Sequence, residues 1–185
     1  MVEAGRIDHA HHAGNAYLAL SETVMLDKAV ASALSKTNQE ETLIIVTADH
    51  SHTFVISGYP ERGNPILGKV KAAGEHGHED AYDGKPYTTL GYINGRGFHP
   101  HVDGQSPDQF NHLPNPGRPA DLSQLDTTLP NYHQEAGVPL DSETHAGEDV
   151  PIYAVGPQAH LFHGTQEQTY LFYVMQYALG LAHHH

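Results

Sequence analysis

The chain has 185 residues, of which 38% are hydrophobic, and this length favours one domain with a core of its own over two. Its 22 acidic and 9 basic side chains give a formal net charge of -13, which argues against nucleic acid and anionic membranes as partners but suits the capture of cations. The absence of cysteine excludes disulfides and thiolate metal sites, and no stretch reads as a signal peptide or a membrane span.

The first part of the chain combines carboxylates and imidazoles with a helical pattern. Apolar residues recur at the 3.6-residue period, so we expect one long helix from about Asp8 or His12 to Ser35. The apolar positions of the predicted face are Tyr17, Leu20, Val24, Ala31 and Leu34. If the first turn includes Asp8, then Asp8 and His12 stand at i and i+4 on one face, where they are able to share an ion. The alternative is ordinary helix-start electrostatics beside a surface histidine.

The residues before this helix read as the end of a strand. Glu3 would lie at the tip of that strand, yet only Met1 and Val2 precede it, and a strand needs several residues. We therefore expect that a preceding part of the chain is missing.

A short aliphatic run, Leu43–Val46, leads into a cluster of metal-ligand types. It has no polar alternation, which predicts a strand covered on both faces, and so an α/β fold with a mostly parallel central sheet flanked by helices. Asp49, His50 and His52 follow its carboxyl end, where open α/β sheets bind ligands. One carboxylate and two imidazoles suit zinc and related divalent ions. The alternative is a polar turn in which Asp49 caps a helix and the histidines are solvated.

The middle of the chain is mostly irregular. Residues 53–57 and 87–94 read as extended segments, and the polar tract 61–83 between them reads as a surface loop. A group of imidazole and carboxylate side chains in this tract reads as solvated rather than as a site. The group consists of His76, His78 and Glu79. Residues 95–134 hold many Gly, Pro and Asn without a sustained period, which marks an insertion, a binding loop or an oligomer contact.

Regular patterns return toward the end of the chain. Residues 151–155 predict a last strand, and a capping-box pattern places the start of a closing helix at Thr165. Ser142 reads as a turn serine rather than a nucleophile, because the glutamate after it would oppose a developing alkoxide. His183–His185 look like the remnant of a purification tag, and removing them leaves 14 of the 17 histidines.

Three separated motifs occur in one order: Val-Glu-Ala-Gly-Arg-Ile-Asp-His-Ala-His-His, then Thr-Ala-Asp-His-Ser-His, then Glu-Thr-His-Ala-Gly-Glu-Asp-Val. Together they resemble the metal-binding motifs of the alkaline phosphatase family. The resemblance is weakest between His99 and Gln134, and it identifies residues 1–182 as the carboxyl-terminal part of such an enzyme. Ala4 departs from the family pattern, since many members have Gly there.

The resemblance implies two zinc ions and one magnesium ion. Asp8, His12 and His145 would bind one zinc, and Asp49 and His50 would contribute to the second. The other positions it singles out are Glu3 as a magnesium ligand, His52 as a histidine that hydrogen-bonds and orients Asp8, and His9 beside the magnesium site.

The resemblance also implies a reaction, the hydrolysis of phosphate monoesters, in which a zinc-activated serine attacks phosphorus. The family's serine, a bridging aspartate, a Thr or Ser magnesium ligand and the phosphate-clamping arginine come from the amino-terminal half, and no stretch here supplies them. We therefore expect that half as a partner, a homodimer when the enzyme is intact, a periplasmic or extracellular location, and negligible activity from this chain alone.

Two alternatives to an alkaline phosphatase stay open from the sequence. A phosphodiesterase, sulfatase or cofactor-independent mutase of the same metal superfamily would use a similar Asp, His and Asp-His pattern, although the wording of the first two motifs favours a phosphatase. The second alternative is a non-catalytic zinc-binding or interaction fragment.

Overall fold

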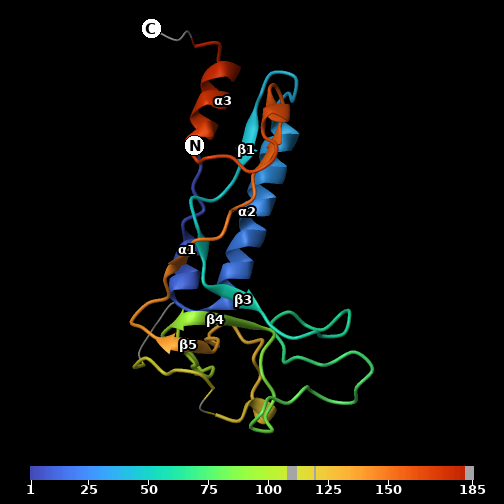
Figure 1. Cartoon of the computed structure of the whole chain (residues 1–185), viewed down its shortest axis with the longest axis vertical. Coiled ribbons are helices and arrows are strands. Elements are labelled where there is room, and N and C mark those ends of the chain that lie inside the picture. Colours follow the sequence, from blue (N-terminus) through green and yellow to red (C-terminus); the bar gives the residue numbers. More distant parts are fainter. Residues whose placement is uncertain (108–111, 119, 182–185) are drawn as a thin grey trace. The chain divides into compact units, whose positions relative to one another are not determined.

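Helices and short strands alternate with long irregular segments along the chain (Figure 1). The computed structural model describes residues 1–107, 112–118 and 120–181, so the predicted tag remnant His183–His185 lies outside the described residues. The helices and strands are α1 (Arg6–His12), α2 (Ala16–Lys36), β1 (Ile44–Val46), β2 (Ser51–His52), β3 (Phe54–Ile56), β4 (Leu90–Gly95), β5 (Ala136–Pro139), β6 (His145–Ala146), β7 (Tyr153–Val155) and α3 (Tyr170–Ala178). Two short 3-10 helices are η1 (Leu122–Gln124) and η2 (Ala159–Leu161).

The chain forms two compact units. The first consists of Met1–Leu26 and His52–Gly147, and the second of Asp27–Ser51 and the described residues from Glu148 onward. The first unit contains α1 and most of the irregular chain, whereas the second contains β1, β7 and α3.

The predicted single helix is divided into two, so that part of the prediction is wrong. Helix α1 ends at His12 and α2 begins at Ala16. Gly14 between them has a φ of +67°, a left-handed conformation that commonly ends a helix. The side-chain oxygen of Asn15 then accepts the Leu18 N–H at 3.0 Å, which caps the new helix. Asp8 and His12 nevertheless share α1 at i and i+4.

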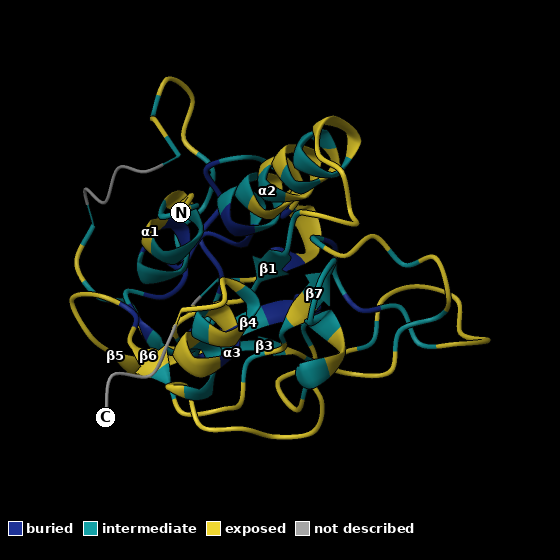
Figure 2. Cartoon of the chain, turned by 90° about the horizontal axis from the view of Figure 1, so that it is seen from above, coloured by how far each residue is buried: buried dark blue, intermediate teal, exposed yellow. Residues whose placement is uncertain are grey.

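The predicted apolar face of α2 is only partly buried. Val24 is 52% exposed, and the buried residues of α2 are Ala16 and Ala19 near its start. Figure 2 shows the rest of α2 in the colours of intermediate and exposed residues. Close packing of this helix therefore depends on small side chains in its first turns.

The strands form small separate sheets, and the prediction of one mostly parallel central sheet is wrong for the described residues. β1 pairs antiparallel with β7, and β3 pairs antiparallel with β4. β4 and β5 pair in parallel, and β2 pairs with β6. An unbroken apolar run predicts a strand but not the direction of its partner, and β1 is half-buried rather than covered on both faces. Helices with small mixed sheets still agree with the α/β class.

The irregular segment after β4 contributes a hydrophobic cluster to the first unit. Phe98, Leu122 and Tyr132 are at most 5% exposed and pack together, with Ala120 and Leu125 against them. The rings of Phe98 and Tyr132 meet edge to face, with centroids 5.9 Å apart. This segment lacks a sequence period, yet it supplies core as well as surface.

Leu122→Ala is expected to lower the free energy of unfolding by about 2–5 kcal/mol, because Leu122 is fully buried and its loss leaves a cavity beside two aromatic rings. Urea unfolding measures the effect. Leu113→Ala is the matched control, since Leu113 is 85% exposed and its loss should change the stability by less than about 0.5 kcal/mol. Equal effects of the two variants would contradict this assignment of the core.

Three histidines of the first unit form a ring cluster, which we call the His99–His112–His133 cluster. The rings of His99 and His112 stack with centroids 4.2 Å apart, and His133 stands edge-on to His112 at 5.5 Å. Nδ1 of His133 donates to the carbonyl of Ala13 at 2.8 Å. Burial lowers the pKa of His112 and of His133 to about 4, so both rings are neutral at pH 7.

The second unit ends in helix α3, which begins at Tyr170 rather than at Thr165. The predicted capping box is therefore wrong, and Thr169 makes no side-chain hydrogen bond at the helix start. Three of the four aromatic side chains of α3 are exposed by more than half. They are Phe172, Tyr173 and Tyr177. None of the described helices has both the length and the apolar character needed to cross a bilayer.

Candidate metal centre

Side chains from two distant segments of the first unit converge on Asp8. Its Oδ1 lies 3.2 Å from Nε2 of His12 and 3.3 Å from Nε2 of His145. The two Nε2 atoms are 3.2 Å apart. Ligand atoms of a tetrahedral zinc ion, each about 2.0–2.1 Å from the metal, lie roughly 3.3 Å from one another. These three atoms therefore have the mutual spacing that one zinc ion requires.

Local structure explains how the ligands meet. The i, i+4 spacing on α1 places Asp8 and His12 on one face of the helix. The backbone N–H of Glu143 donates to the carbonyl of His12 at 3.2 Å, which ties the end of α1 to the segment before His145. Nδ1 of His12 donates to the Glu143 carbonyl at 2.6 Å, so in the neutral ring that a metal ligand requires, Nε2 would supply the lone pair.

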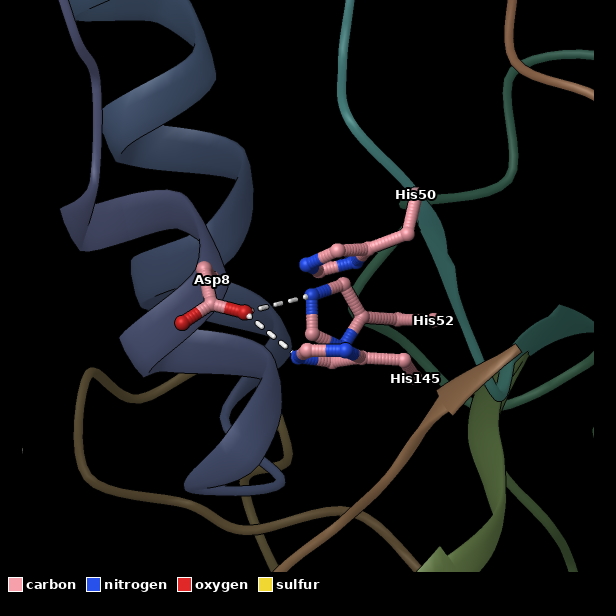
Figure 3. Close-up of side chains that lie close together, drawn as sticks. All are labelled: Asp8, His50, His52 and His145. Atoms are coloured by element: carbon pink, nitrogen blue, oxygen red, sulfur yellow. Dashed lines mark ion pairs between the residues drawn. The ribbon is translucent and has the colours of Figure 1, made fainter. Parts of the chain in front are cut away.

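His52 lies beside the three predicted zinc ligands, and Figure 3 shows its ring facing Asp8 together with that of His145. Its Nε2 is 3.1 Å from Asp8 Oδ1, and its Nδ1 is 2.7 Å from Glu143 Oε2. The side chain of His52 is only 8% exposed. His52 thus connects the carboxylate of Asp8 to a second, deeper carboxylate.

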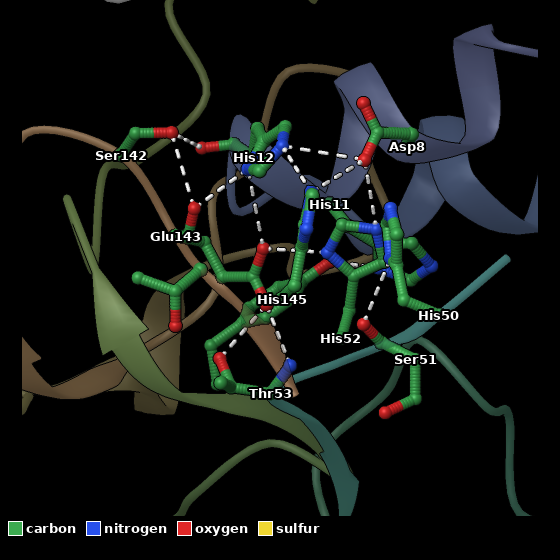
Figure 4. A network of polar contacts seen from close by, with 12 residues as sticks. Asp8, His11, His12, His50, Ser51, His52, Thr53, Ser142, Glu143 and His145 are labelled. Carbon is green, nitrogen blue, oxygen red and sulfur yellow. Dashed lines mark hydrogen bonds and ion pairs between the residues drawn. The ribbon is translucent and has the colours of Figure 1, made fainter. Parts of the chain in front are cut away.

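That deeper carboxylate, Glu143, is a candidate functional residue that the sequence reasoning missed. It is 1% exposed, and its Oε1 accepts the backbone N–H of Thr53 at 2.6 Å and the Thr53 hydroxyl at 2.9 Å (Figure 4). Burial opposes ionisation of Glu143, but hydrogen bonds from His52 and Thr53 outweigh it and lower its pKa. The neighbouring Ser142 is exposed and donates to the Glu143 carbonyl at 3.2 Å, in keeping with a turn serine.

His11 packs on the other side of His52. The two rings stack with centroids 4.6 Å apart, and Nδ1 of His11 hydrogen-bonds to the hydroxyl of Tyr92 at 3.0 Å. Burial lowers the pKa of His11 to about 4 and raises that of Tyr92 well above its ordinary value. A neutral His11 therefore supports the His52 ring without adding charge. Nothing in the sequence around His11 indicated that its ring would stack on His52.

The other predicted site residues are Glu3, His9, Asp49 and His50. Glu3 and His9 are exposed, and neither belongs to a closely spaced group of ligand atoms within the described residues. Asp49 and His50 belong to the second unit, after β1, where His50 Nε2 lies 3.5 Å from Asp49 Oδ2. Their assignment to a second zinc, and that of Glu3 to magnesium, stay predictions.

A sequence profile of the family described as alkaline phosphatase matches residues 1–181. The chain belongs to the alkaline phosphatase family. The tissue-nonspecific isozymes of alkaline phosphatase from Rattus norvegicus and Homo sapiens are each 43% identical to it over 178 residues, and that from Gallus gallus is 44% identical. Each comparison covers 96% of this chain but 30% of the relative, so the chain spans less than a third of the length of these curated relatives.

The alkaline phosphatase family is metal-dependent. Asp8 and His145 belong to one group of ligand atoms close enough to hold a metal ion, and His12 belongs to a second group that also includes His52. Asp8 supplies a carboxylate oxygen, and His12 and His145 supply imidazole nitrogens, which are common zinc ligands. The three ligand atoms already lie 3.2–3.3 Å from one another, as close as ligands of one zinc ion. The family profile reaches both ends of the set, from Asp8 to His145.

Proposed function

We propose that this chain is the metal-binding part of an alkaline phosphatase, an enzyme that hydrolyses phosphate monoesters. Asp8, His12 and His145 hold one zinc ion in this proposal. The observation that carries it is the triangle of ligand atoms with sides of 3.2, 3.2 and 3.3 Å, formed by residues 137 positions apart at most. Membership of the family supports the choice of reaction.

Bound zinc would supply a Lewis acid that stabilises negative charge on oxygen at neutral pH. The chain's own residues prepare the site for that role. One carboxylate and two neutral imidazoles cancel only one of the two positive charges of zinc, so the site retains attraction for an anionic substrate. Three protein ligands are also the number typical of a catalytic zinc site, which keeps a further position open.

The remaining groups of the reaction belong to the same proposal. Asp49 and His50 contribute to a second zinc, and Glu3, with His9 nearby, to a magnesium site. The serine nucleophile and the phosphate-clamping arginine come from the amino-terminal half of the enzyme. Homodimer formation and a periplasmic or extracellular location rest on the family resemblance alone.

His145→Ala in the full-length enzyme is expected to remove about one zinc ion per chain and nearly all hydrolysis of p-nitrophenyl phosphate, because the ion loses one of three protein ligands. Metal content is measured by mass spectrometry after gel filtration. His76→Ala is the control, since His76 is exposed and lies outside the cluster. An unchanged zinc content in His145→Ala would show that the assignment is wrong.

The substrate is tested separately with p-nitrophenyl sulfate and bis(p-nitrophenyl) phosphate. Hydrolysis of the monoester far above the other two supports an alkaline phosphatase. A preference for the sulfate or the diester would instead favour another member of the metal superfamily, and zinc binding without any hydrolysis by the full-length protein would favour a non-catalytic zinc protein.

A further inference from the structure

Glu143 makes more contacts with the candidate zinc centre than its place in the sequence suggests. Its Oε2 is 2.7 Å from Nδ1 of His52, and its backbone carbonyl is 2.6 Å from Nδ1 of His12. The same carboxylate oxygen lies 3.6 Å from Nδ1 of His12. One residue therefore contacts the far nitrogen of two imidazoles whose near nitrogens face Asp8 (Figure 4).

Thr53 fixes the orientation of the Glu143 carboxylate by holding the oxygen that does not face His52. Oε1 accepts two hydrogen bonds from Thr53, one from the backbone N–H and one from the hydroxyl. Thr53 is 7% exposed and directly precedes strand β3, so both donors belong to well-packed chain. With Oε1 held there, Oε2 points at His52, and rotation of the carboxylate would break three short hydrogen bonds.

The hydrogen-bond pattern determines which ring nitrogens carry protons. An ionised carboxylate and a carbonyl are both acceptors only, so Nδ1 of His52 and Nδ1 of His12 must each donate. In the neutral ring that a zinc ligand requires, Nε2 of His12 then supplies the lone pair, and the ring of His52 is oriented with its Nε2 3.1 Å from Asp8 Oδ1. Partners of this kind orient metal ligands and raise the affinity for the metal.

We propose that Glu143 is a positioning residue of the zinc centre, which fixes the proton positions and ring orientations of His12 and His52 through its carbonyl and its carboxylate. The inference rests on the proposed function only in that Asp8, His12 and His145 bind zinc. It does not depend on the reaction catalysed. It places the His52 ring in a chain of polar contacts that runs from Thr53 through Glu143 and His52 to Asp8.

Glu143→Gln tests this with little change of volume. If the amide oxygen faces Thr53, the NH2 group meets the Nδ1–H of His52, and only movement of that proton to Nε2 relieves the clash. If the NH2 group faces Thr53, it meets the backbone N–H that donates to Oε1 in the wild type. Zinc affinity, measured by competition with a chromophoric chelator, is expected to fall about 10–100-fold. The ring ¹⁵N spectrum of the zinc-free protein is expected to show loss of the Nδ1 proton from His52 in the variant.

Glu135→Gln is the matched control. Glu135 is a second poorly exposed glutamate of the first unit, it also accepts from a threonine hydroxyl (Thr88, 2.5 Å), and burial raises its pKa toward the neutral form that Gln imitates. Its zinc affinity should equal that of the wild type. Equal losses in Glu143→Gln and Glu135→Gln would overturn the proposal, because the effect would then be a general one.

A measurement on the wild type keeps the proposal testable even if Glu143→Gln fails to fold. Ring ¹⁵N shifts of the zinc-free protein should show protons on Nδ1 of both His12 and His52, and their absence from either ring would overturn the proposal. Failure of the proposed function has a different result. Unchanged zinc content in His145→Ala contradicts the zinc site, whereas unchanged affinity in Glu143→Gln contradicts only the positioning role.

Discussion

Asp8→Asn is expected to abolish most of the stabilisation that zinc gives to the protein. Asp8 Oδ1 lies within 3.3 Å of Nε2 of His12, His52 and His145, so its negative charge would attract the ion and orient the rings. A ligand present at 100 times its dissociation constant stabilises a fold by about 2.7 kcal/mol. Loss of a direct ligand should weaken binding by more than the roughly 10–100-fold typical of an outer hydrogen-bonding partner, which removes most of that gain.

The measurement for Asp8→Asn is the melting temperature of the protein with and without added zinc at pH 8. Asp27→Asn is the control, since Asp27 is exposed on α2 and should leave the zinc-dependent rise in melting temperature intact. A rise in Asp8→Asn as large as that of the wild type would rule out Asp8 as a zinc ligand.

His133→Gln is expected to reduce the loss of folding stability that occurs as the pH falls below about 6.5. The folded-state pKa of His133 is about 4, below the ordinary value of 6.5, so the native protein keeps this ring neutral. The contribution of the neutral His133 ring to the free energy of unfolding is therefore fully present above about pH 6.5. It is lost as the pH falls toward 4, because the unfolded chain binds the proton more readily. For a shift of this size the loss between pH 7.5 and 4.5 is roughly 2–3 kcal/mol.

Urea unfolding of zinc-free protein at these two pH values measures the effect, and the comparison between variant and wild type removes the titration of other groups. Gln retains a donor for the Ala13 carbonyl that His133 contacts. His78→Gln is the control, because His78 is exposed and its replacement should leave the pH dependence unchanged. The same pH dependence in His133→Gln and the wild type would contradict the prediction.

Local spacing made part of the candidate site predictable. Asp8 and His12 meet because a helix brings i and i+4 together, and this holds although the helix is shorter than expected. The break after His12 was also readable, since Gly14 followed by Asn15 is a stop signal next to a start signal. The prediction of one helix relied instead on the apolar residues that recur at the 3.6-residue period as far as Leu34.

Non-local features could not be predicted from spacing. His145 was found only through the resemblance, because nothing local links it to α1. Glu143 was missed because a buried carboxylate is recognised by its partners, and these lie 90 residues away at Thr53. The direction of the β1 ladder was wrong for the same reason, since an apolar run carries no information on which distant strand will pair with it.

The turn between α1 and α2 has a consequence for the time course of folding. Its hydrogen-bonding partners come from far along the chain, because Gln134 accepts the Ala16 N–H and donates its own N–H to Gly14. Ala16 and Gln134 are 118 residues apart, a separation that takes roughly 6–24 s to translate at about 5–20 residues per second. During synthesis on a ribosome, the turn after α1 therefore lacks these hydrogen bonds until Gln134 has emerged. Helix α1 carries Asp8 and His12, so their final position is also fixed only then. His145 follows 11 residues later, so the three proposed zinc ligands meet only when most of this chain has been made.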